Sequence, residues 1–213
     1  MKVIDKSALL GAPLQESPFP YAVIGRSFCP SLDPGVLADE FLTDGFKYDV
    51  RLANPEGKKQ YRAYNYQLLD RGNLCHDHIA RLTPNWRDVL DDVCSAEYRA
   101  AIATLTGIDL DDTVLDVRLV RYGHNDWIEP HVDRPDKTVT HLYYLSKEWK
   151  QEWSGALRIL RSSDIDDCAR EVLPLAGVSV IMMRTDLSWH AVPAVRSTSG
   201  QYRNVFLVHF VTR

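Results

Sequence analysis

Five short runs of strand-forming residues lie in the second half of the chain, and they constrain its fold more than any other feature. The runs are VLDVRLVRY (114–122), HLYYL (141–145), ALRIL (156–160), VSVIMM (178–183) and NVFLVHF (204–210). Loops that contain Gly, Pro, Asp and Ser separate them. Short strands at such spacing are typical of an antiparallel sandwich or a jelly roll. We therefore expect a mainly β core that begins near residue 112.

The first 111 residues contain fewer strand signals and more helical ones. A strand is expected near 21–24, and apolar residues at helical spacing predict a short surface helix over 33–46. Capping residues and stop signals predict two further helices, over 83–94 and 95–107. The sequence contains no segment that reads as a linker. We expect one domain over 1–213, in which this first half supports the β core with flanking helices.

The charge and the cysteine pattern limit the partners and the compartment. The 213 residues carry a formal net charge of -4 with Lys and Arg scattered, so neither nucleic acid nor an anionic membrane is expected as a partner. No apolar run is long enough to cross a bilayer, and the first residues do not resemble a signal peptide. We expect a cytoplasmic protein in which Cys29, Cys75, Cys94 and Cys168 are free thiols.

A histidine and an aspartate one residue apart introduce the chemistry. His131 and Asp133 would point to the same face of a strand, because side chains alternate between the two faces. His190 lies on a later strand, which a double-stranded β-helix would bring opposite this pair. Two histidines and one carboxylate with open positions beside them suit Fe(II) oxygen chemistry. Taken alone, an H-x-D pair is also compatible with a solvated strand end.

An iron centre of this kind needs a co-substrate that supplies two electrons, and 2-oxoglutarate is suited to that task. Its distal carboxylate would need a cation at the far end of the pocket. Arg203 begins the last strand-forming run, where its guanidinium could bind that carboxylate in a bidentate manner. Alternation places Val205, Leu207 and His209 on the same face of the strand. Taken alone, Arg203 is also compatible with a solvent-facing strand end, and Arg196 in the preceding loop is the less favoured candidate.

The order of these motifs resembles a known enzyme family. The sequence contains RYG, H-x-D, T-x-L-x-Y-L, SGALRI, a strand before H-x-V-P and a late arginine strand, in that order. This order resembles the prolyl 4-hydroxylase-like branch of the Fe(II)/2-oxoglutarate dioxygenases. The stretch HVDRPDKTVTHLYYLSKEWKQEWSGALRIL is especially similar to the catalytic core of the hypoxia-inducible-factor prolyl hydroxylases. The resemblance covers about residues 112–211 and extends to the N-terminal half only in outline.

The resemblance implies a role for several individual residues. The iron ligands would be His131, Asp133 and His190, with Arg203 holding the distal carboxylate of the co-substrate. Tyr122 and Tyr144 match two family tyrosines of the co-substrate pocket, although each is also compatible with plain strand packing. The implied fold is a double-stranded β-helix, and the implied cofactors are Fe(II), 2-oxoglutarate and O2, with ascorbate as a candidate reductant.

The chain also departs from the family pattern. The loop VRSTSGQY between His190 and Arg203 is several residues longer than in those prolyl hydroxylases. Arg118 shares a strand face with Tyr122, at a position where that family carries an apolar pocket residue. We expect Arg118 to bind a carboxylate or phosphate of the substrate, or else to form an internal ion pair with Asp116. Further substrate contacts are expected from Leu142, Trp127 and His209.

Three other features of the sequence are candidates for a metal site or a lid. The run CHDH (75–78) has no partner pair at zinc spacing, so a polar loop is the preferred interpretation. Trp127, Trp149 and Trp153 flank the H-x-D strand and are compatible with a lid or with packing. The acidic stretches 109–113 and 164–167 lack the Gly and the closing Glu of a calcium loop, and we interpret them as solvated turns.

The sequence therefore predicts an Fe(II)- and 2-oxoglutarate-dependent oxygenase that hydroxylates an unactivated C–H bond. Desaturation or ring closure would use the same site, whereas an intact Asp133 argues against halogenation. We favour a small-molecule substrate, either a free amino acid or a natural-product intermediate, over a prolyl residue of a peptide or protein. The alternatives of another class are a non-catalytic jelly-roll sensor that binds a metal or ligand, and a cupin-like metalloenzyme that uses no oxoacid.

Overall fold

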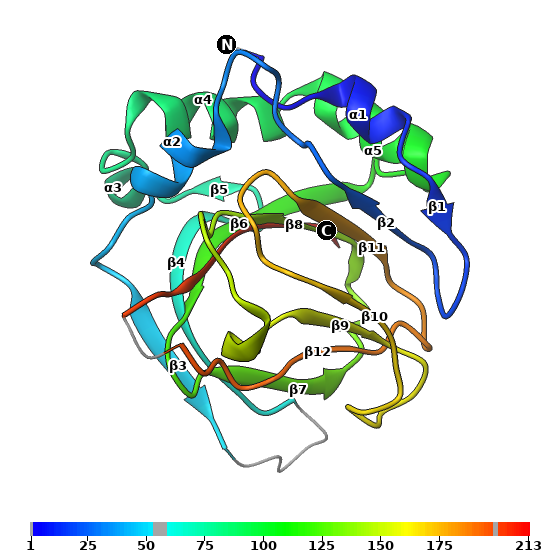
Figure 1. The fold of residues 1–213 in the computed structure, drawn as a ribbon. Coiled ribbons are helices and arrows are strands. Elements are labelled where there is room, and N and C mark those ends of the chain that lie inside the picture. Colours follow the sequence, from blue (N-terminus) through cyan, green and yellow to red (C-terminus); the bar gives the residue numbers. More distant parts are fainter. Residues whose placement is uncertain (1, 53–58, 198–199) are drawn as a thin grey trace.

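The computed structural model describes residues 2–52, 59–197 and 200–213, and it is a curled antiparallel sheet with helices along one side (Figure 1). The helices are α1 (Lys6–Leu10), α2 (Pro34–Asp39), α3 (His76–Ile79), α4 (Pro84–Val93) and α5 (Ala96–Thr106), with a 3-10 turn at Gln151–Trp153. The strands are β1 (Leu14–Gln15), β2 (Tyr21–Ile24), β3 (Lys47–Arg51), β4 (Tyr61–Asp70), β5 (Asn73–Leu74), β6 (Thr113–Tyr122), β7 (Trp127–His131), β8 (Lys137–Tyr144), β9 (Leu157–Leu160), β10 (Cys168–Val172), β11 (Ser179–Met183), β12 (His190–Val192) and β13 (Arg203–Thr212). The expected mainly β architecture with flanking helices is confirmed.

The strands follow one hydrogen-bonded path that bends back on itself. The larger layer runs in the order β1-β2-β11-β8-β13-β6-β4, and β7-β12-β9-β10 forms the opposite layer. β4 joins the two layers, because its residues 64–69 pair with β6 while its residues 61–62 pair with β7. The result is the jelly roll that the sequence predicts, with an interior between the two layers (Figure 1).

Strict alternation along β6 and β13 separates two hydrophobic cores. The two strands pair over ten residues, from Arg203 opposite Tyr122 to Thr212 opposite Thr113. Val117 and Phe206 belong to the core between the larger layer and the helices. Val120 and Val205, by contrast, belong to the core inside the roll. The inward side chains of β6 and β13 therefore include Tyr122, Val120, Arg118 and Asp116 together with Arg203, Val205, Leu207 and His209.

Helices α4 and α5 pack on the outer face of the larger layer, as the sequence predicts. Thr83 and Ser95 cap their N-termini by accepting hydrogen bonds from backbone N–H groups, and Gly107 ends α5 in the left-handed conformation. Trp86 on α4 is buried and lies edge-on to Phe206 of β13, with 5.6 Å between ring centroids. Its indole N–H donates to the carbonyl of Leu37, which ties α2 to the same core.

One buried carboxylate fixes the N-terminal segment to α4. Asp92 accepts hydrogen bonds from the backbone N–H groups of Val3 and Ile4, each at 2.8 Å, and it contacts the ammonium group of Lys6. Burial alone would raise the pKa of Asp92, but the hydrogen bonds from Lys6, Ile4 and Val3 outweigh it and hold that pKa below its ordinary value. The charged carboxylate is therefore part of the folded state.

Two expectations for the N-terminal half need correction. The helix predicted over 33–46 ends at Asp39, because Glu40 accepts a hydrogen bond from Asn85 of α4 and Phe41 packs edge-on against Trp86. These tertiary contacts outweigh the helical spacing of the apolar residues. In addition, the ten-residue strand β4 was not predicted, although it connects the two layers. Its inward residues include the polar Asn65 and Gln67, so it lacks the apolar character of the other core strands.

The four cysteines are free thiols, as expected. Within the described residues, no helix is long and apolar enough to cross a membrane.

We expect Asp92→Asn to lower the free energy of unfolding by about 1–3 kcal/mol, because the buried N–H groups and Lys6 lose a charged acceptor. Urea denaturation at neutral pH would measure this loss. The lowered pKa of Asp92 means that its contribution is present above the ordinary aspartate pKa of 3.8 and is lost as the pH falls through the folded-state value. The difference between the two proteins should therefore shrink in acid. Asp91→Asn, at the exposed neighbouring position, is the control and should cost almost nothing. An equal loss in both variants would contradict the assignment.

Candidate active site

Two neighbouring strands of the smaller layer hold the predicted metal ligands together. His131 is the last residue of β7 and His190 is the first residue of β12, and the two are directly paired across the antiparallel strands. Their imidazole ring centroids lie 4.2 Å apart. Asp133 follows two residues after His131, and ligand atoms of all three residues lie within 4.8 Å of one another. Among the described residues this is the one group with such geometry.

Backbone carbonyl groups orient both imidazoles. The Nδ1 atom of His131 lies 2.9 Å from the carbonyl oxygen of Glu129, and the Nδ1 atom of His190 lies 2.9 Å from that of Ser188. A carbonyl oxygen can only accept, so each Nδ1 carries the proton and each Nε2 keeps a lone pair. Burial lowers the pKa of both histidines, that of His131 well below its ordinary value, so both rings are neutral. Neutral rings with free Nε2 lone pairs are suited to binding a metal.

Asp133 completes the donor set with a carboxylate that is held at both oxygens. Its Oδ2 accepts a hydrogen bond from the hydroxyl of Thr140 at 2.8 Å, and its Oδ1 lies 2.7 Å from the ammonium nitrogen of Lys137. Burial would raise the pKa of Asp133, but the charges of Lys137 and Lys59 outweigh it and hold that pKa well below its ordinary value. The carboxylate is therefore ionised and able to bind a cation.

A lysine ammonium group already lies against two of the three ligands. The Nζ atom of Lys59 is 2.9 Å from Nε2 of His131 and 3.8 Å from Oδ1 of Asp133. Burial, together with the charge of Lys137, lowers the pKa of Lys59 to about 7. The amine of Lys59 thus lies where a metal held by His131 and Asp133 would lie. The donor set of two neutral imidazoles and one carboxylate fits Fe(II).

At the start of β13, a buried arginine lacks an anionic partner. Arg203 is 1% exposed, and its Nε donates to the carbonyl of Gly155 at 2.8 Å, but its Nη2 has no hydrogen-bond partner among the described residues. The buried hydroxyl of Tyr144 also has none. The guanidinium carbon lies 5.1 Å from the ring centroids of both Tyr122 and Tyr144. A buried cation with an unused donor needs an anion, and a carboxylate would satisfy it.

Gly155 and two tyrosines determine the position and the polar contacts of the Arg203 guanidinium. Gly155 has a φ of +70°, and a Cβ atom there would lie 2.7 Å from a methyl group of Val195, so only glycine places its carbonyl against Arg203 without strain. Burial raises the pKa of Tyr122, and it raises that of Tyr144 to about 12, so both hydroxyls keep their protons and can donate. The competing candidate Arg196 is exposed.

The other residues predicted to contact the substrate lie in different places. Arg118 and His209 line a hollow of about 230 Å³ inside the roll, on the same sheet face as Arg203. Leu142 is buried on β8, where it pairs with Leu207 of β13. Trp127 lies instead in a separate apolar hollow of about 510 Å³, together with Val192 and Pro193.

A second, larger hollow opens beside the metal ligands. It measures about 960 Å³ and is lined by His131 and Asp133. It adjoins the smaller hollow, because Arg51, Lys59 and Arg134 line both. The predicted metal site therefore lies next to two connected spaces of different size.

The CHDH run and two of the tryptophans make packing contacts. His78 of the CHDH run stacks on Tyr66 and contacts the carbonyl oxygen of Gln67 at 2.7 Å, and the run forms no metal-binding group among the described residues. Trp149 is buried, donates to the carbonyl of Ser154 and packs edge-on against Trp153, which supports the packing interpretation for these two.

Sequence reasoning missed several residues of the site. Thr140 could have been found, because it precedes Leu142 and Tyr144 in the alternating T-x-L-x-Y pattern and so shares their face. Lys137 lies at the start of the same strand and gave no signal. Lys59 follows the segment 53–58, which lies outside the described residues, and no sequence pattern connects it to His131.

Comparison with known proteins shows similarity to one family. Residues 117–210 match the model of the 2OG-Fe(II) oxygenase superfamily. A prolyl-4-hydroxylase from Pseudomonas putida is similar in structure, with a TM-score of 0.54 and 19% identity over 91% of this chain and 92% of that one. A prolyl hydroxylase from Trichoplax adhaerens, solved in complex with a hypoxia inducible factor peptide fragment, has a TM-score of 0.63 and 12% identity over 97% of this chain and 89% of that one. A search of curated proteins gave no match.

The matched segment contains the features described above. The range 117–210 includes His131, Asp133 and His190 as well as Arg203. Enzymes of this superfamily use Fe(II), 2-oxoglutarate and O2, and the donor set and the unsatisfied arginine of this chain fit the first two.

We expect Thr140→Val to weaken Fe(II) binding roughly 10–100-fold, because the carboxylate of Asp133 loses the hydroxyl that orients it. The substitution preserves shape, so the fold should persist. Anaerobic calorimetric titration with Fe(II) would measure the change. Thr138→Val, two residues earlier on β8, is the matched control and should bind Fe(II) like the wild type. Equal affinity in all three proteins would contradict a positioning role for Thr140.

Proposed function

We propose that this chain, whose residues 117–210 form a 2OG-Fe(II) oxygenase domain, hydroxylates an unactivated C–H bond of a small molecule such as a free amino acid or a natural-product intermediate. The observation that carries the proposal is the buried guanidinium of Arg203 with its unused donor, inside the same roll as the His131, Asp133 and His190 group. A metal-binding sensor or an oxoacid-independent enzyme has no need for such a cation.

The proposed roles of the residues follow from their contacts. His131, Asp133 and His190 would hold Fe(II), with their orientation fixed by backbone carbonyls and by Thr140. Arg203, with the hydroxyls of Tyr122 and Tyr144 as neighbours, would hold the distal carboxylate of 2-oxoglutarate. When bound, iron and its co-substrate supply the oxidation: 2-oxoglutarate, O2 and R–H give succinate, CO2 and R–OH, with one oxygen atom in each of the succinate and the alcohol. The protein positions the reactants and limits water.

The smaller hollow supports a small-molecule substrate. At about 230 Å³ it has the scale of a metabolite, and it is lined by inward residues of β4, β6 and β13. The larger hollow beside His131 and Asp133 favours the second candidate, a peptide substrate, because an extended chain would need an open space of that kind. The Trichoplax adhaerens neighbour was solved with a peptide fragment, which keeps this second candidate in view.

We expect anaerobic titration of the protein with Fe(II) and 2-oxoglutarate to produce the weak visible charge-transfer band of the chelated metal. Arg203→Ala and His190→Ala should each lose the band, the first through loss of the carboxylate partner and the second through loss of a metal ligand. Arg170→Ala and His76→Ala, both at exposed positions, are the matched controls and should keep it. No band in the wild-type protein would favour the sensor or the oxoacid-independent enzyme.

We expect free amino acids or related small molecules to stimulate succinate release more than proline-containing peptides of four to ten residues or so, because the smaller hollow limits the size of the substrate. Mass spectrometry of the product would separate hydroxylation, which adds one oxygen, from desaturation or ring closure, which removes two hydrogens. Stimulation by peptides alone would favour the prolyl hydroxylase alternative.

A further inference from the structure

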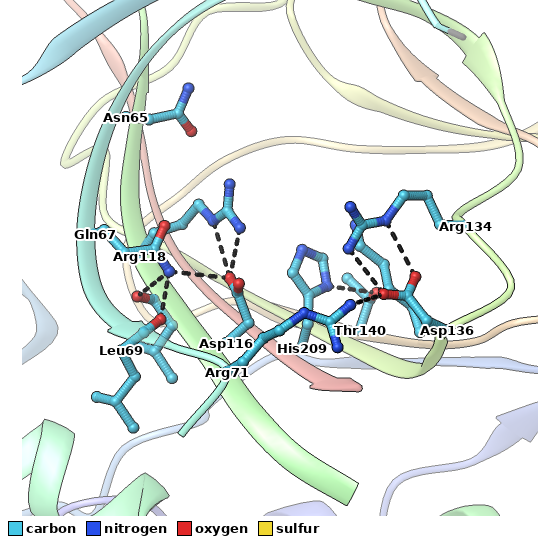
Figure 2. Close-up of polar contacts among 12 residues, drawn as sticks. Asn65, Gln67, Leu69, Arg71, Asp116, Arg118, Arg134, Asp136, Thr140 and His209 are labelled. Carbon is cyan, nitrogen blue, oxygen red and sulfur yellow. Dashed lines mark hydrogen bonds and ion pairs between the residues drawn. The ribbon is translucent and has the colours of Figure 1, made fainter. Parts of the chain in front are cut away.

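The hollow lined by Arg118 and His209 is polar on one side, and Figure 2 shows the side chains that make it so. Asn65 comes from β4, Arg118 from β6 and His209 from β13. These strands are neighbours in the larger layer, so the three side chains gather on one inward face. In the proposed function, the part of this face near Arg203 holds the co-substrate and the hollow holds a small-molecule substrate. The chemical groups of that substrate can be inferred from the residues that line the hollow.

The lining of this hollow is basic. Five basic residues contribute to it, namely Arg51, Lys59, Arg118, Arg134 and Lys137, together with the acidic Asp49. Three of them are paired with carboxylates outside this lining: Arg118 with Asp116, Arg134 with Asp136 and Lys137 with Asp133. Bound Fe(II) would add two further positive charges beside Asp133. Cations gathered in a partly closed space repel one another and lose hydration, and an anionic ligand relieves both costs.

Arg118 is held so that one edge of its guanidinium remains available. Its Nε and Nη2 donate to Oδ1 of Asp116 at 3.2 and 2.5 Å, and the amide nitrogen of Gln67 donates to the same oxygen at 3.2 Å. Its Nη1 makes no hydrogen bond to a described residue and points away from Asp116 in Figure 2. The side chain is 28% exposed. Asp116 and Gln67 therefore fix the orientation of a cation that still faces the hollow.

His209 and Asn65 each offer an acceptor to the same space. The hydroxyl of Thr140 donates its one proton to Asp133, so it can only accept from Nδ1–H of His209 at 2.9 Å. Burial and the charge of Lys137 hold the pKa of His209 well below its ordinary value, so the ring is neutral and its Nε2 has a free lone pair. The amide nitrogen of Asn65 donates to Asp49 at 3.1 Å, which leaves its oxygen as an acceptor.

The spacing of these groups limits the kind of ligand that can contact all of them. In the register of β6 and β13, Arg118 lies opposite Leu207 and Asp116 lies opposite His209, so Arg118 and His209 are diagonal neighbours. Diagonal neighbours on one sheet face lie about 7–8 Å apart at the backbone. A ligand that bridges them needs an anion at one end and an N–H or O–H donor a few bonds away.

We infer that the substrate is a small carboxylic acid with an adjacent hydrogen-bond donor, an α-amino or α-hydroxy acid, whose carboxylate binds Nη1 of Arg118 and whose donor faces His209 and Asn65. This inference rests on the proposed function and deepens it. The ion pair of Arg118 with Asp116 serves here to position the guanidinium. An ion pair with a purely structural role would not leave Nη1 of Arg118 without a partner among the described residues on the side of the hollow.

The first test uses the holoenzyme and a panel of substrates. Succinate release would be measured with free amino acids, the corresponding α-hydroxy acids, their α-carboxamides, small phosphate monoesters and short peptides. We expect an amino or hydroxy acid to stimulate release, and its carboxamide to show a kcat/KM at least roughly tenfold lower, because a charge-assisted hydrogen bond is lost. Stimulation by a phosphate monoester or a peptide alone, or equal stimulation by acid and carboxamide, would overturn the inference.

The second test changes the protein. Arg118→Gln should raise the KM for the acid at least roughly tenfold while leaving the 2-oxoglutarate titration unchanged, and Arg118→Lys should restore part of the affinity. Arg170→Gln, an exposed strand arginine, is the control. An unchanged KM in a folded Arg118→Gln protein would overturn the inference. If that variant does not fold, the kcat/KM values of the wild-type protein for the acid and its carboxamide still test whether a carboxylate is recognised.

The failure of this inference can be told apart from the failure of the proposed function. If the anaerobic band with Fe(II) and 2-oxoglutarate does not form, the oxygenase assignment fails, and this inference fails with it. If the band forms and no small acid either perturbs it or stimulates succinate release, the oxygenase assignment stands and the acid-binding role of Arg118 is wrong.

Discussion

The pairing of His131 with His190 across β7 and β12 is the contact on which the rest of the site depends. It places two imidazoles side by side at 4.2 Å in a buried position, and backbone carbonyl groups orient both rings as they do in metal-binding histidines. The pairing can form only within the smaller layer, because β7 and β12 belong to it. That layer joins the larger one through β4. Most of β4 pairs with β6, and its first residues pair with β7. The metal site is thus a consequence of how the sheet closes.

The two anion sites proposed above lie on the interior face of the larger layer, at different points along the same strands. Arg203 lies opposite Tyr122, and Arg118 lies four residues before Tyr122 on β6, a separation of about 13 Å at the usual strand rise. The two arginines differ in their environment. Arg203 is fully buried between two tyrosine rings, whereas Arg118 borders a hollow and is held by Asp116. A fixed co-substrate suits the first position, and a substrate that enters and leaves suits the second.

Features of the site that depend on residues close together in the sequence could be predicted, and features that depend on distant contacts could not. Alternation within one strand correctly put Arg203 and His209 on one face, and the i, i+2 spacing brought Asp133 to the same point as His131. The carbonyl groups that orient the histidines have no side-chain signature, so no sequence pattern reveals them. β4 escaped prediction because the polar Asn65, which lines the hollow, and Gln67, which donates to Asp116, give it the character of a surface segment. The polar residues of β4 that lie inside the roll are therefore the same residues that prevented its prediction as a core strand.

The same reasoning explains why an ion pair at Arg118 is informative. The Arg118–Asp116 pair is partly buried, and such a pair contributes little net stability, since an apolar pair of similar volume often does as well or better. Val120 and Val205, nearby on the same face, show that apolar side chains pack well inside this roll. Arg118, Asp116 and Gln67 together maintain a charged group where a methionine or leucine would fill the space at lower cost. Such an arrangement is expected where a cation must face a ligand in a fixed orientation. The side chain is then already ordered before the ligand binds, so binding loses less conformational entropy.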